Sequence, residues 1–352
     1  MIDAATRTIT IHNDEARRDT SGAIVDAHEP CLRRFSDRFY LYGTNYRHHN
    51  GFTPDNLIVC YSSPDLLNWT NHDALFPPFP TGLTVAPDIL WNEQTRRYVL
   101  WFINGGNYVV ATAEQPTGPF RIHTRQADIR HKDAGCGDFA LFQDADGSAY
   151  LIATLTFTKD RQQTDRRHCI LIERLTDDYL GGTGATSATL GSNCEAPVLF
   201  RKDDTYYALF DTTCCYCPDG TGIQVHTASD PLGPYTYRGN VNRDLDADPR
   251  SIPSPGTEPG SGRPDATVPA QQRRVEWIQT IEGPVLLWIG DRWGSAPDGI
   301  KGHDATYWTP LAFEDDGMLA ALRWRDSFTI RIDVPGAAED GRSPAQPARK
   351  RR

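Results

Sequence analysis

Residues 195–211, EAPVLFRKDDTYYALFD, decide the fold class. A polar residue opens the stretch, an apolar run follows, Asp203-Asp204 mark a turn, and a Tyr-rich run returns. This order predicts a β-hairpin, because short runs of strand-forming residues bounded by turn formers are typical of paired strands. The same order recurs in HEPCLRRFSDRFYLYGT (28–44), APDILWNEQTRRYVLWF (86–102), GDFALFQDADGSAYLIAT (137–154) and, more loosely, VPAQQRRVEWIQTIEGPVLLWIGDRW (268–293). The chain therefore contains five copies of one unit.

Further strands follow the hairpin in each of the first four copies. They end in related turns, in YSSPDLLNW (61–69), TAEQPTGPF (112–120), RLTDDYLG (174–181) and TASDPLGPY (227–235). Units of about 50 to 60 residues with short strands and almost no helical periodicity predict an all-β, five-bladed β-propeller with four antiparallel strands per blade. An array of two β-sandwich domains is the alternative, and the fixed order of polar opening, turn and Tyr-rich strand argues against it.

No linker separates the copies, so we expect residues 1–335 to form a single catalytic domain. Residues 243–267 are rich in Pro, Gly, Ser and Asp and predict a long loop between the fourth and fifth blades, either disordered or a rim over the site. Residues 336–352 predict a disordered tail. A targeting role for its last four residues, Arg349-Lys350-Arg351-Arg352, is the less favoured alternative.

The charge balance argues against a nucleic-acid partner. The chain has 46 Asp and Glu against 36 Lys and Arg, whereas a nucleic-acid site needs a basic field. The first twenty residues lack the apolar core of a secretory signal, and no apolar run approaches the roughly 18 residues of a membrane span. We therefore expect a cytoplasmic protein with no membrane partner, although secretion by another route stays open.

Eight cysteines are spread along the chain rather than concentrated in a disulfide scaffold. Cys214, Cys215 and Cys217 form a cluster, but no second CxxC or HxxxH pair completes a tetrahedral zinc site. Structural thiols are the favoured interpretation.

Polar residues open every copy, and the first strand of each propeller blade lines the central channel, so these residues should converge. Burying several acids together disfavours ionisation and raises at least one pKa, which suits glycosidic cleavage by a proton donor and a base. Strand-capping by each acid separately is the alternative. The converging residues are Asp26, His28 and Glu29 from the first copy, Asp88 from the second, Asp138 from the third, Glu195 from the fourth, and Gln271 and Gln272 from the fifth.

At these residues the sequence resembles glycoside hydrolase family 43 over residues 20–332, and that resemblance implies a five-bladed propeller with three central acids. Glu195-Ala196-Pro197 matches the family's E-[GA]-P element, which implies that Glu195 is the general acid. Asp138 matches the Asp that orients this acid and adjusts its pKa. The resemblance is closest to the exo-β-1,3-galactanase branch, through Ala27-His28, CYSSPDLLNW, PTGPF, residues 177–180 and IGDRWGS.

The candidate for the general base is open. In the galactanase branch a fifth-blade Gln replaces the base, and Gln271 falls there, with Gln272 as its neighbour. Glu29-Pro30 stands where the wider family has the Asp-Pro that supplies the base, so Glu29 is favoured over Asp26.

The substrate is also open. Val85-Ala86-Pro87-Asp88 stands where the branch has a substrate-reading E-R-P element, which puts galactan in doubt. The resemblance implies an inverting hydrolase acting on galactan-type or arabinan- and xylan-type side chains. A catalytically inactive glycan-binding propeller and a glycoside phosphorylase are the alternatives, and Arg292 with His28 is a thin set for binding phosphate.

The remaining expectations concern ligands and assembly. We expect a carbohydrate substrate, no required cofactor and a monomer. The resemblance admits a structural calcium or another cation in the channel, which His28 could help to hold, but no metal ligands are assigned. The residues expected to contact substrate are His28, Asp88, Asp211, Gln272, Arg292 and Trp293, and Tyr46 could stack on a sugar.

Overall fold

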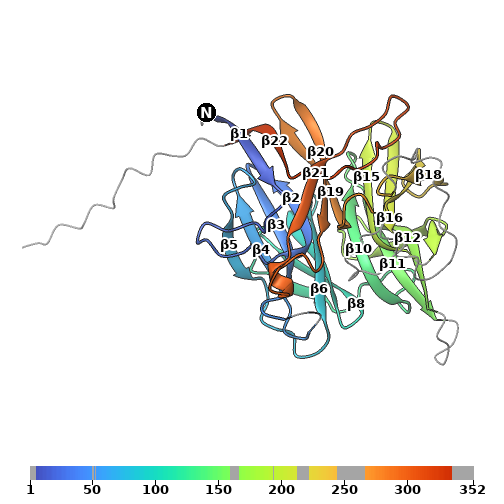
Figure 1. Cartoon of the computed structure of the whole chain (residues 1–352). Helices are drawn as coiled ribbons and strands as arrows, with labels where there is room; N and C mark the ends of the chain where they lie inside the picture. The colour runs from blue at the N-terminus through green and yellow to red at the C-terminus, as the bar shows by residue number, and fades with distance from the viewer. Residues whose placement is uncertain are drawn as a thin grey trace, which may run out of the picture.

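The computed structural model describes residues 5–49, 51, 53–158, 166–192, 194–211, 222–243 and 266–334 (Figure 1). In this part of the chain one short 3-10 helix, η2 (Lys301–His303), accompanies the strands. Residues 244–265 of the predicted inter-blade loop, the predicted tail and the Cys214, Cys215 and Cys217 cluster lie outside the described residues. The single-domain assignment therefore stays a prediction. None of the helices in the described ranges could cross a membrane.

Five antiparallel sheets form the five predicted blades. Blade one has the order β2 (His28–Phe35), β3 (Arg38–Asn45), β4 (Leu57–Ser63), β5 (Thr70–Ala74). Blade two has β6 (Thr84–Asn92), β7 (Arg97–Asn104), β8 (Asn107–Ala113), β9 (Arg121–Thr124). Blade three has β10 (Gly135–Gln143), β11 (Ala149–Thr158), β12 (Arg166–Leu175), β13 (Gly182–Thr186), and the short β14 (Gly191–Ser192) also pairs with β12.

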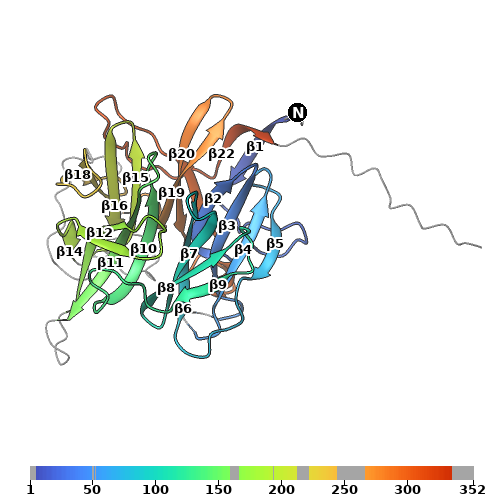
Figure 2. The same ribbon diagram turned by 180° about the vertical axis from the view of Figure 1, so that it is seen from behind.

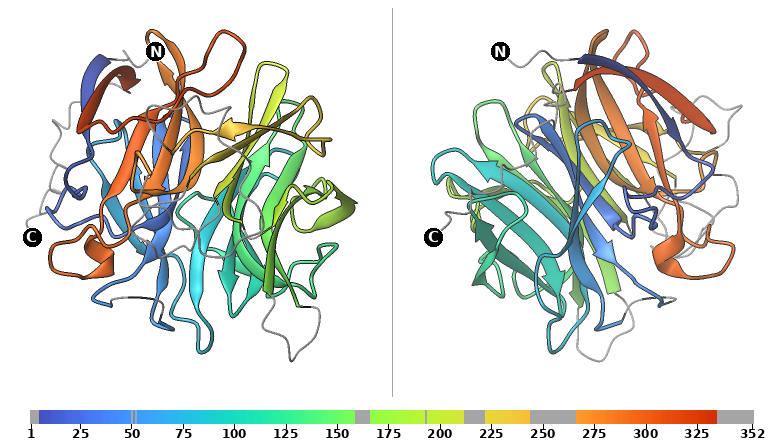
Figure 3. Two further views of the ribbon diagram at one scale, coloured as in Figure 1. Left: turned by 45° about the vertical axis from the view of Figure 1, so that its right-hand side comes forward. Right: turned by 90° about the vertical axis from the view of Figure 1, so that its left-hand side faces the viewer.

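Blade four has the order β15 (Glu195–Lys202), β16 (Thr205–Asp211), β17 (Gln224–Ala228), β18 (Thr236–Asn240). Blade five pairs three strands, β19 (Gln271–Thr280), β20 (Gly283–Asp291) and β21 (Thr306–Pro310). Each first strand packs against the first strand of the next blade, and β19 packs against β2, so the ring closes (Figure 3). The predicted all-β, five-bladed propeller is confirmed.

The hydrophobic core lies between neighbouring blades. One cluster joins blades one and two around Tyr42 and Phe102, and another joins blades two and three around Trp101 and Leu151. Equivalent clusters join the remaining neighbours. Because burial of apolar area is the main favourable term in folding, these interfaces hold the ring together and leave its centre to polar residues.

The two ends of the described chain pair with each other in a separate two-stranded sheet. Strand β1 (Ala5–His12) pairs with β22 (Ser327–Val334) along its whole length, and the two run side by side in Figure 2. Ile11 and Ile332 from this ribbon are buried against Ile278 and Leu287 of blade five. The ribbon therefore packs at the junction of the last blade with the first.

A β-bulge interrupts every inner strand near its start. The pairing with the second strand shifts between His28 and Cys31, Val85 and Asp88, Cys136 and Phe139, Glu195 and Val198, and Gln272 and Arg274. In three blades the first bulge residue precedes a proline and has positive φ: 51° at Glu29, 55° at Ala86 and 50° at Ala196. Proline is tolerated at bulges because no ladder hydrogen bond is lost there. Bulges re-aim side chains next to active sites, and here they direct the opening residues toward the centre.

Candidate active site

Arg273, the bulge residue of blade five, joins carboxylates from two other blades. Its Nη1 lies 2.9 Å from Asp138 Oδ2, and its Nη2 lies 3.8 Å from Glu29 Oε1. All three side chains are largely buried, and the Arg273 side chain is 5% exposed. Burial opposes the charge of Arg273, but Asp138 and Glu29 raise its pKa above the usual range. The three bulge residues therefore form one buried charged group of two carboxylates and one guanidinium.

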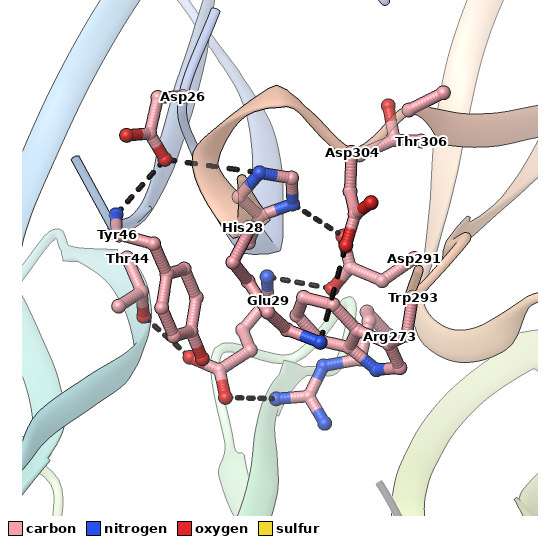
Figure 4. A network of polar contacts seen from close by, with 12 residues as sticks. Asp26, His28, Glu29, Thr44, Tyr46, Arg273, Asp291, Trp293, Asp304 and Thr306 are labelled. Carbon is pink, nitrogen blue, oxygen red and sulfur yellow. Dashed lines mark hydrogen bonds and ion pairs between the residues drawn. The ribbon is translucent and has the colours of Figure 1, made fainter. Parts of the chain in front are cut away.

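The two carboxylate oxygens of Glu29 differ in their contacts: Oε2 is hydrogen-bonded, and Oε1 faces Arg273. Glu29 Oε2 accepts a hydrogen bond from the Thr44 hydroxyl (Figure 4). It also accepts one from the Ala86 backbone N–H, at 2.9 Å. Burial raises the pKa of Glu29, Arg273 lowers it, and the charge of Asp138 raises it again, with a net rise. Oε1, the oxygen nearer Arg273, is the one placed to accept a proton.

His28 lies between carboxylates of the first and fifth blades. Its Nδ1 is 3.2 Å from Asp291 Oδ1, and its Nε2 is 3.7 Å from Asp26 Oδ1 (Figure 4). Burial alone would lower the pKa of His28, but the hydrogen bond to Asp291 and the charges of Asp291, Asp26 and Asp304 raise it to about 9. His28 is therefore a buried imidazolium at neutral pH.

Asp26 holds the loop after β3. Its Oδ1 accepts the Tyr46 backbone N–H at 2.9 Å and its Oδ2 accepts that of Arg47 at 2.7 Å. Burial raises the pKa of Asp26, while His28 and both backbone N–H groups lower it. Both oxygens thus have protein donors, in contrast to Glu29.

Glu195 opens blade four and contacts a histidine from blade three. Its Oε1 lies 2.9 Å from Nδ1 of His168 in β12. Its Oε2 is buried and has no hydrogen-bond partner among the described residues. Asp211, buried on β16, is its register partner across the β15–β16 ladder. One oxygen of Glu195 is therefore anchored and the other is available.

The two fifth-blade glutamines are oriented by neighbours. Gln271 Oε1 accepts the Trp293 indole N–H at 2.9 Å, and Gln272 Nε2 donates to the Ala196 carbonyl at 2.7 Å. Each has one amide atom left, Gln271 Nε2 as a donor and Gln272 Oε1 as an acceptor, with no partner in the described ranges. Gln271 thus presents an N–H rather than a proton acceptor.

Several of the buried polar atoms without a hydrogen-bond partner in the described ranges belong to residues that open three inner strands. They include His28 Nε2, Glu195 Oε2, Gln271 Nε2 and Gln272 Oε1, all nearly inaccessible. Most buried polar groups in native proteins are hydrogen-bonded, so a group of exceptions needs an explanation. A polar ligand or bound water at the centre of the ring supplies one.

Comparison with known proteins identifies the family of this chain. Residues 23–257 match the sequence profile of glycosyl hydrolases family 43. The chain belongs to this family. It is 26% identical over 271 residues to an arabinoxylan arabinofuranohydrolase of Bacillus subtilis, a match that covers 62% of this chain and 51% of the relative. The chain thus spans about half the length of that relative.

Two solved structures share the fold of this family 43 chain. The exo-β-1,3-galactanase of Clostridium thermocellum is 22% identical with a TM-score of 0.72, and the match covers 90% of this chain and 66% of that one. The exo-β-1,3-galactanase of Phanerochaete chrysosporium, solved with galactose, is 21% identical with a TM-score of 0.70, covering 91% and 68%.

Asp88 of the family 43 chain does not lie with the other polar residues that open the repeats. It sits one residue beyond its bulge, and its carboxylate contacts Arg33 at 2.7 Å and Arg274 at 2.9 Å. It also accepts the Leu141 backbone N–H at 2.7 Å. Because these partners occupy both oxygens, the geometry does not support substrate contact by Asp88 and indicates a buried ion-pair role.

The contacts of Arg292 and Trp293 also differ from the substrate contacts predicted for them. The Arg292 guanidinium packs 4.7 Å from the Trp324 ring centre and donates to the Asn13 carbonyl, so it points to the outer part of blade five. Trp293 is buried, and the Lys301 ammonium lies 4.0 Å from its ring centre. Tyr46, 5.9 Å from Trp293 between ring centres, is buried as well. These contacts do not support phosphate binding by Arg292 or sugar stacking on either ring.

Three residues of the site were missed by sequence reasoning: Arg273, Asp291 and His168. Arg273 follows Gln271-Gln272 directly, and its position as a one-residue bulge could be recognised only after the other four bulges were aligned. Asp291 ends the second strand of the fifth copy, within the IGDRWGS element. His168 lies on β12, the third strand of blade three, where no motif indicated a functional residue.

The residues around His28 do not fit a bound cation. Within the described ranges, no group of three or more His, Cys, Asp or Glu side chains is arranged to hold a metal ion. The oxygens of Asp26 accept backbone N–H groups, and His28 carries a positive charge of its own. These hydrogen bonds already use the Asp26 oxygens that a cation would need as ligands.

Proposed function

We propose that this family 43 protein hydrolyses glycosidic bonds of an oligo- or polysaccharide by single displacement with inversion. The proposal rests on acids at the start of three inner strands: Glu195, whose Oε2 is buried without a hydrogen-bond partner among the described residues, and Glu29 and Asp138, which share Arg273. Inverting glycoside hydrolysis requires a carboxylic acid that donates to the leaving oxygen and a carboxylate that activates water.

Glu195 is the general acid in this proposal. His168 holds Oε1, so Oε2 is the oxygen that carries the proton to the leaving group.

Glu29 is the general base. Its Oε1 lies 3.8 Å from Arg273, whereas the two oxygens of Asp26 accept backbone N–H groups at 2.9 and 2.7 Å. Gln271 presents its amide N–H and is a weaker candidate. Arg273 favours the ionised form of Glu29, which a base must have before it can remove a proton from water.

Asp138 acts through charge and through Arg273. Its ion pair fixes the guanidinium that faces Glu29, and its negative charge raises the pKa of Glu29. It therefore couples the base to the rest of the site without needing to contact the reacting atoms.

The sugar is best sought among galactosides, arabinosides and xylosides. The relatives named above act on arabinoxylan or on β-1,3-galactan by name, and this chain carries the apolar Val85 at the opening of blade two. An apolar residue there cannot accept hydrogen bonds from sugar hydroxyls, so this chain cannot bind galactan through that position as the galactanase branch does.

A catalytically inactive glycan-binding propeller is the second candidate. A phosphorylase is less favoured, because Arg273 is already paired with two carboxylates and Arg292 points away. The cytoplasmic location and the monomeric state stay predictions.

The test is hydrolysis of aryl α-L-arabinofuranosides, β-D-xylosides and β-D-galactosides and of β-1,3-galacto-oligosaccharides by wild type and Glu195→Gln, with calorimetric binding in parallel. Sugar release by wild type, with loss of turnover but retained binding in the variant, supports the hydrolase. Binding without turnover in wild type supports the glycan-binding candidate, and turnover that requires phosphate supports the phosphorylase.

A further inference from the structure

The general acid has a partner from a different blade. His168 lies on β12, the third strand of blade three, and its Nδ1 reaches Glu195 Oε1 at 2.9 Å. The His168 side chain is 35% exposed and that of Glu195 is 18% exposed. Both side chains are therefore partly accessible to solvent.

This contact distinguishes the two oxygens of Glu195. His168 Nδ1 lies at ion-pair distance from Oε1, while Oε2 is buried without a hydrogen-bond partner in the described part of the chain. The oxygen that faces the ring nitrogen is the one favoured to carry negative charge, so the acidic proton of the protonated acid rests on the other oxygen. His168 thereby decides which oxygen can donate.

We infer that His168 is a positioning residue for the general acid, an inference that rests on the proposed hydrolase function. The proton passes from Glu195 Oε2 to the glycosidic oxygen as the bond from the anomeric carbon to that oxygen breaks. The electron pair of that bond stays on the departing oxygen, and Glu195 becomes a carboxylate. On the opposite face a water oxygen bonds to the anomeric carbon and gives its proton to Glu29.

The attraction between His168 and Glu195 strengthens as this charge develops. A hydrogen bond to an ionised acceptor is roughly twice as strong as one between neutral groups. The interaction is therefore greater in the transition state than in the ground state, which is the condition for an effect on kcat rather than on binding alone.

The other titratable groups near this pair do not replace His168. Cys194 lies beside Glu195, and burial raises the pKa of its thiol to about 12, so it stays neutral. Asp211 is the register partner of Glu195 and offers no proton donor when ionised. Cys169 follows His168 in the chain, and its Sγ lies 4.0 Å from the Ser192 hydroxyl.

The test uses leaving groups of different basicity. An activated aryl glycoside, such as a dinitrophenyl glycoside, leaves without protonation, whereas an alkyl glycoside or oligosaccharide needs the acid. We expect His168→Leu to lower kcat on the unactivated substrate on the order of 10- to 100-fold, the effect of one hydrogen bond to a charged group, with little change on the activated one. His168→Asn, whose side-chain amide can take the place of Nδ1–H, should restore part of the loss.

Two further variants keep the result interpretable. In a Glu195→Gln background His168→Leu should have no additional effect, because it acts through Glu195. His123→Leu, on the exposed outer strand β9, is the matched control and should leave both substrates unchanged.

Equal losses of His168→Leu on activated and unactivated substrates would indicate a merely structural role, and no loss on either would indicate no role. Either result overturns the inference while hydrolysis by wild type still stands. Absence of hydrolysis by wild type on every substrate would instead refute the proposed function itself.

Discussion

Asp291 in blade five accepts a 2.7 Å hydrogen bond from the backbone N–H of Glu29 in blade one. Glu29 has a φ of 51°, a backbone conformation that non-glycine residues rarely adopt. The last blade thus holds the bulge that aims the candidate base at the centre. Closure of the ring and construction of the site depend on the same contact.

The stability of the protein should depend on pH through His28. Its pKa is about 9 in the folded chain against 6.5 ordinarily, so its stabilising charge is fully present below pH 6.5 and is lost as the pH rises through about 9. The difference of about 2.5 units corresponds to ~3 kcal/mol. Urea unfolding at pH 6 and pH 9.5 should show a fall in the free energy of unfolding that His28→Gln largely removes. The same pH dependence in that variant would contradict the assignment, and His123→Gln serves as control.

Glu29 and Asp26 can be separated by paired substitutions. We expect Glu29→Gln to lower kcat by about 10²- to 10⁴-fold, the usual contribution of a general base, even on activated aryl glycosides that need no acid. Asp26→Asn should cost less than about tenfold, because the Asp26 oxygens are bonded to backbone N–H groups. Exogenous azide should rescue Glu29→Gln by forming a glycosyl azide of inverted configuration. A larger effect at Asp26 than at Glu29 would assign the base to Asp26.

Arg273 should set the acidic limb of the pH profile. Since its charge lowers the pKa of Glu29, removing it in Arg273→Met raises that pKa further. The base then stays protonated to higher pH, and the acidic limb of kcat/KM moves upward. Arg273→Lys, which keeps the charge, should move it less. A limb that stays in place in Arg273→Met would show that Glu29 is not the group that titrates.

Asp88 should matter for stability and not for chemistry. Asp88→Asn leaves Arg33 and Arg274 with an uncompensated buried charge, which we expect to cost about 3 to 5 kcal/mol of unfolding free energy. The kcat/KM of the folded fraction should stay close to that of wild type. Asp128→Asn, which breaks an exposed ion pair with Lys132, is the control and should change stability by less than about 1 kcal/mol. A selective loss of activity in Asp88→Asn would restore its place among the substrate contacts.

The sequence predicted the propeller because each copy repeats one order of strand and turn, and residues 195–211 contain it in full. It also predicted that Glu195 and Asp138 belong to the centre. The sequence analysis placed Asp88 with Asp138, but the two residues differ by one position relative to the bulge. Asp138 lies inside the bulge of blade three, whereas Asp88 lies one residue beyond the bulge of blade two. In a strand, a shift of one residue moves a side chain to the other face.

The contacts of Arg273 and His168 could not be predicted from the sequence. Arg273 reaches carboxylates more than a hundred residues away in the chain, and His168 reaches Glu195 from the third strand of the neighbouring blade. Both contacts depend on how the blades pack together, and local patterns carry no information about that packing.

The most direct test is the anomer that wild type releases first, followed by ¹H NMR from the start of hydrolysis on the best β-configured substrate of the panel. The account predicts that the α-anomer appears first and that the β-anomer grows in only at the rate of mutarotation. Initial release of the β-anomer would contradict single displacement and the roles given to Glu195 and Glu29.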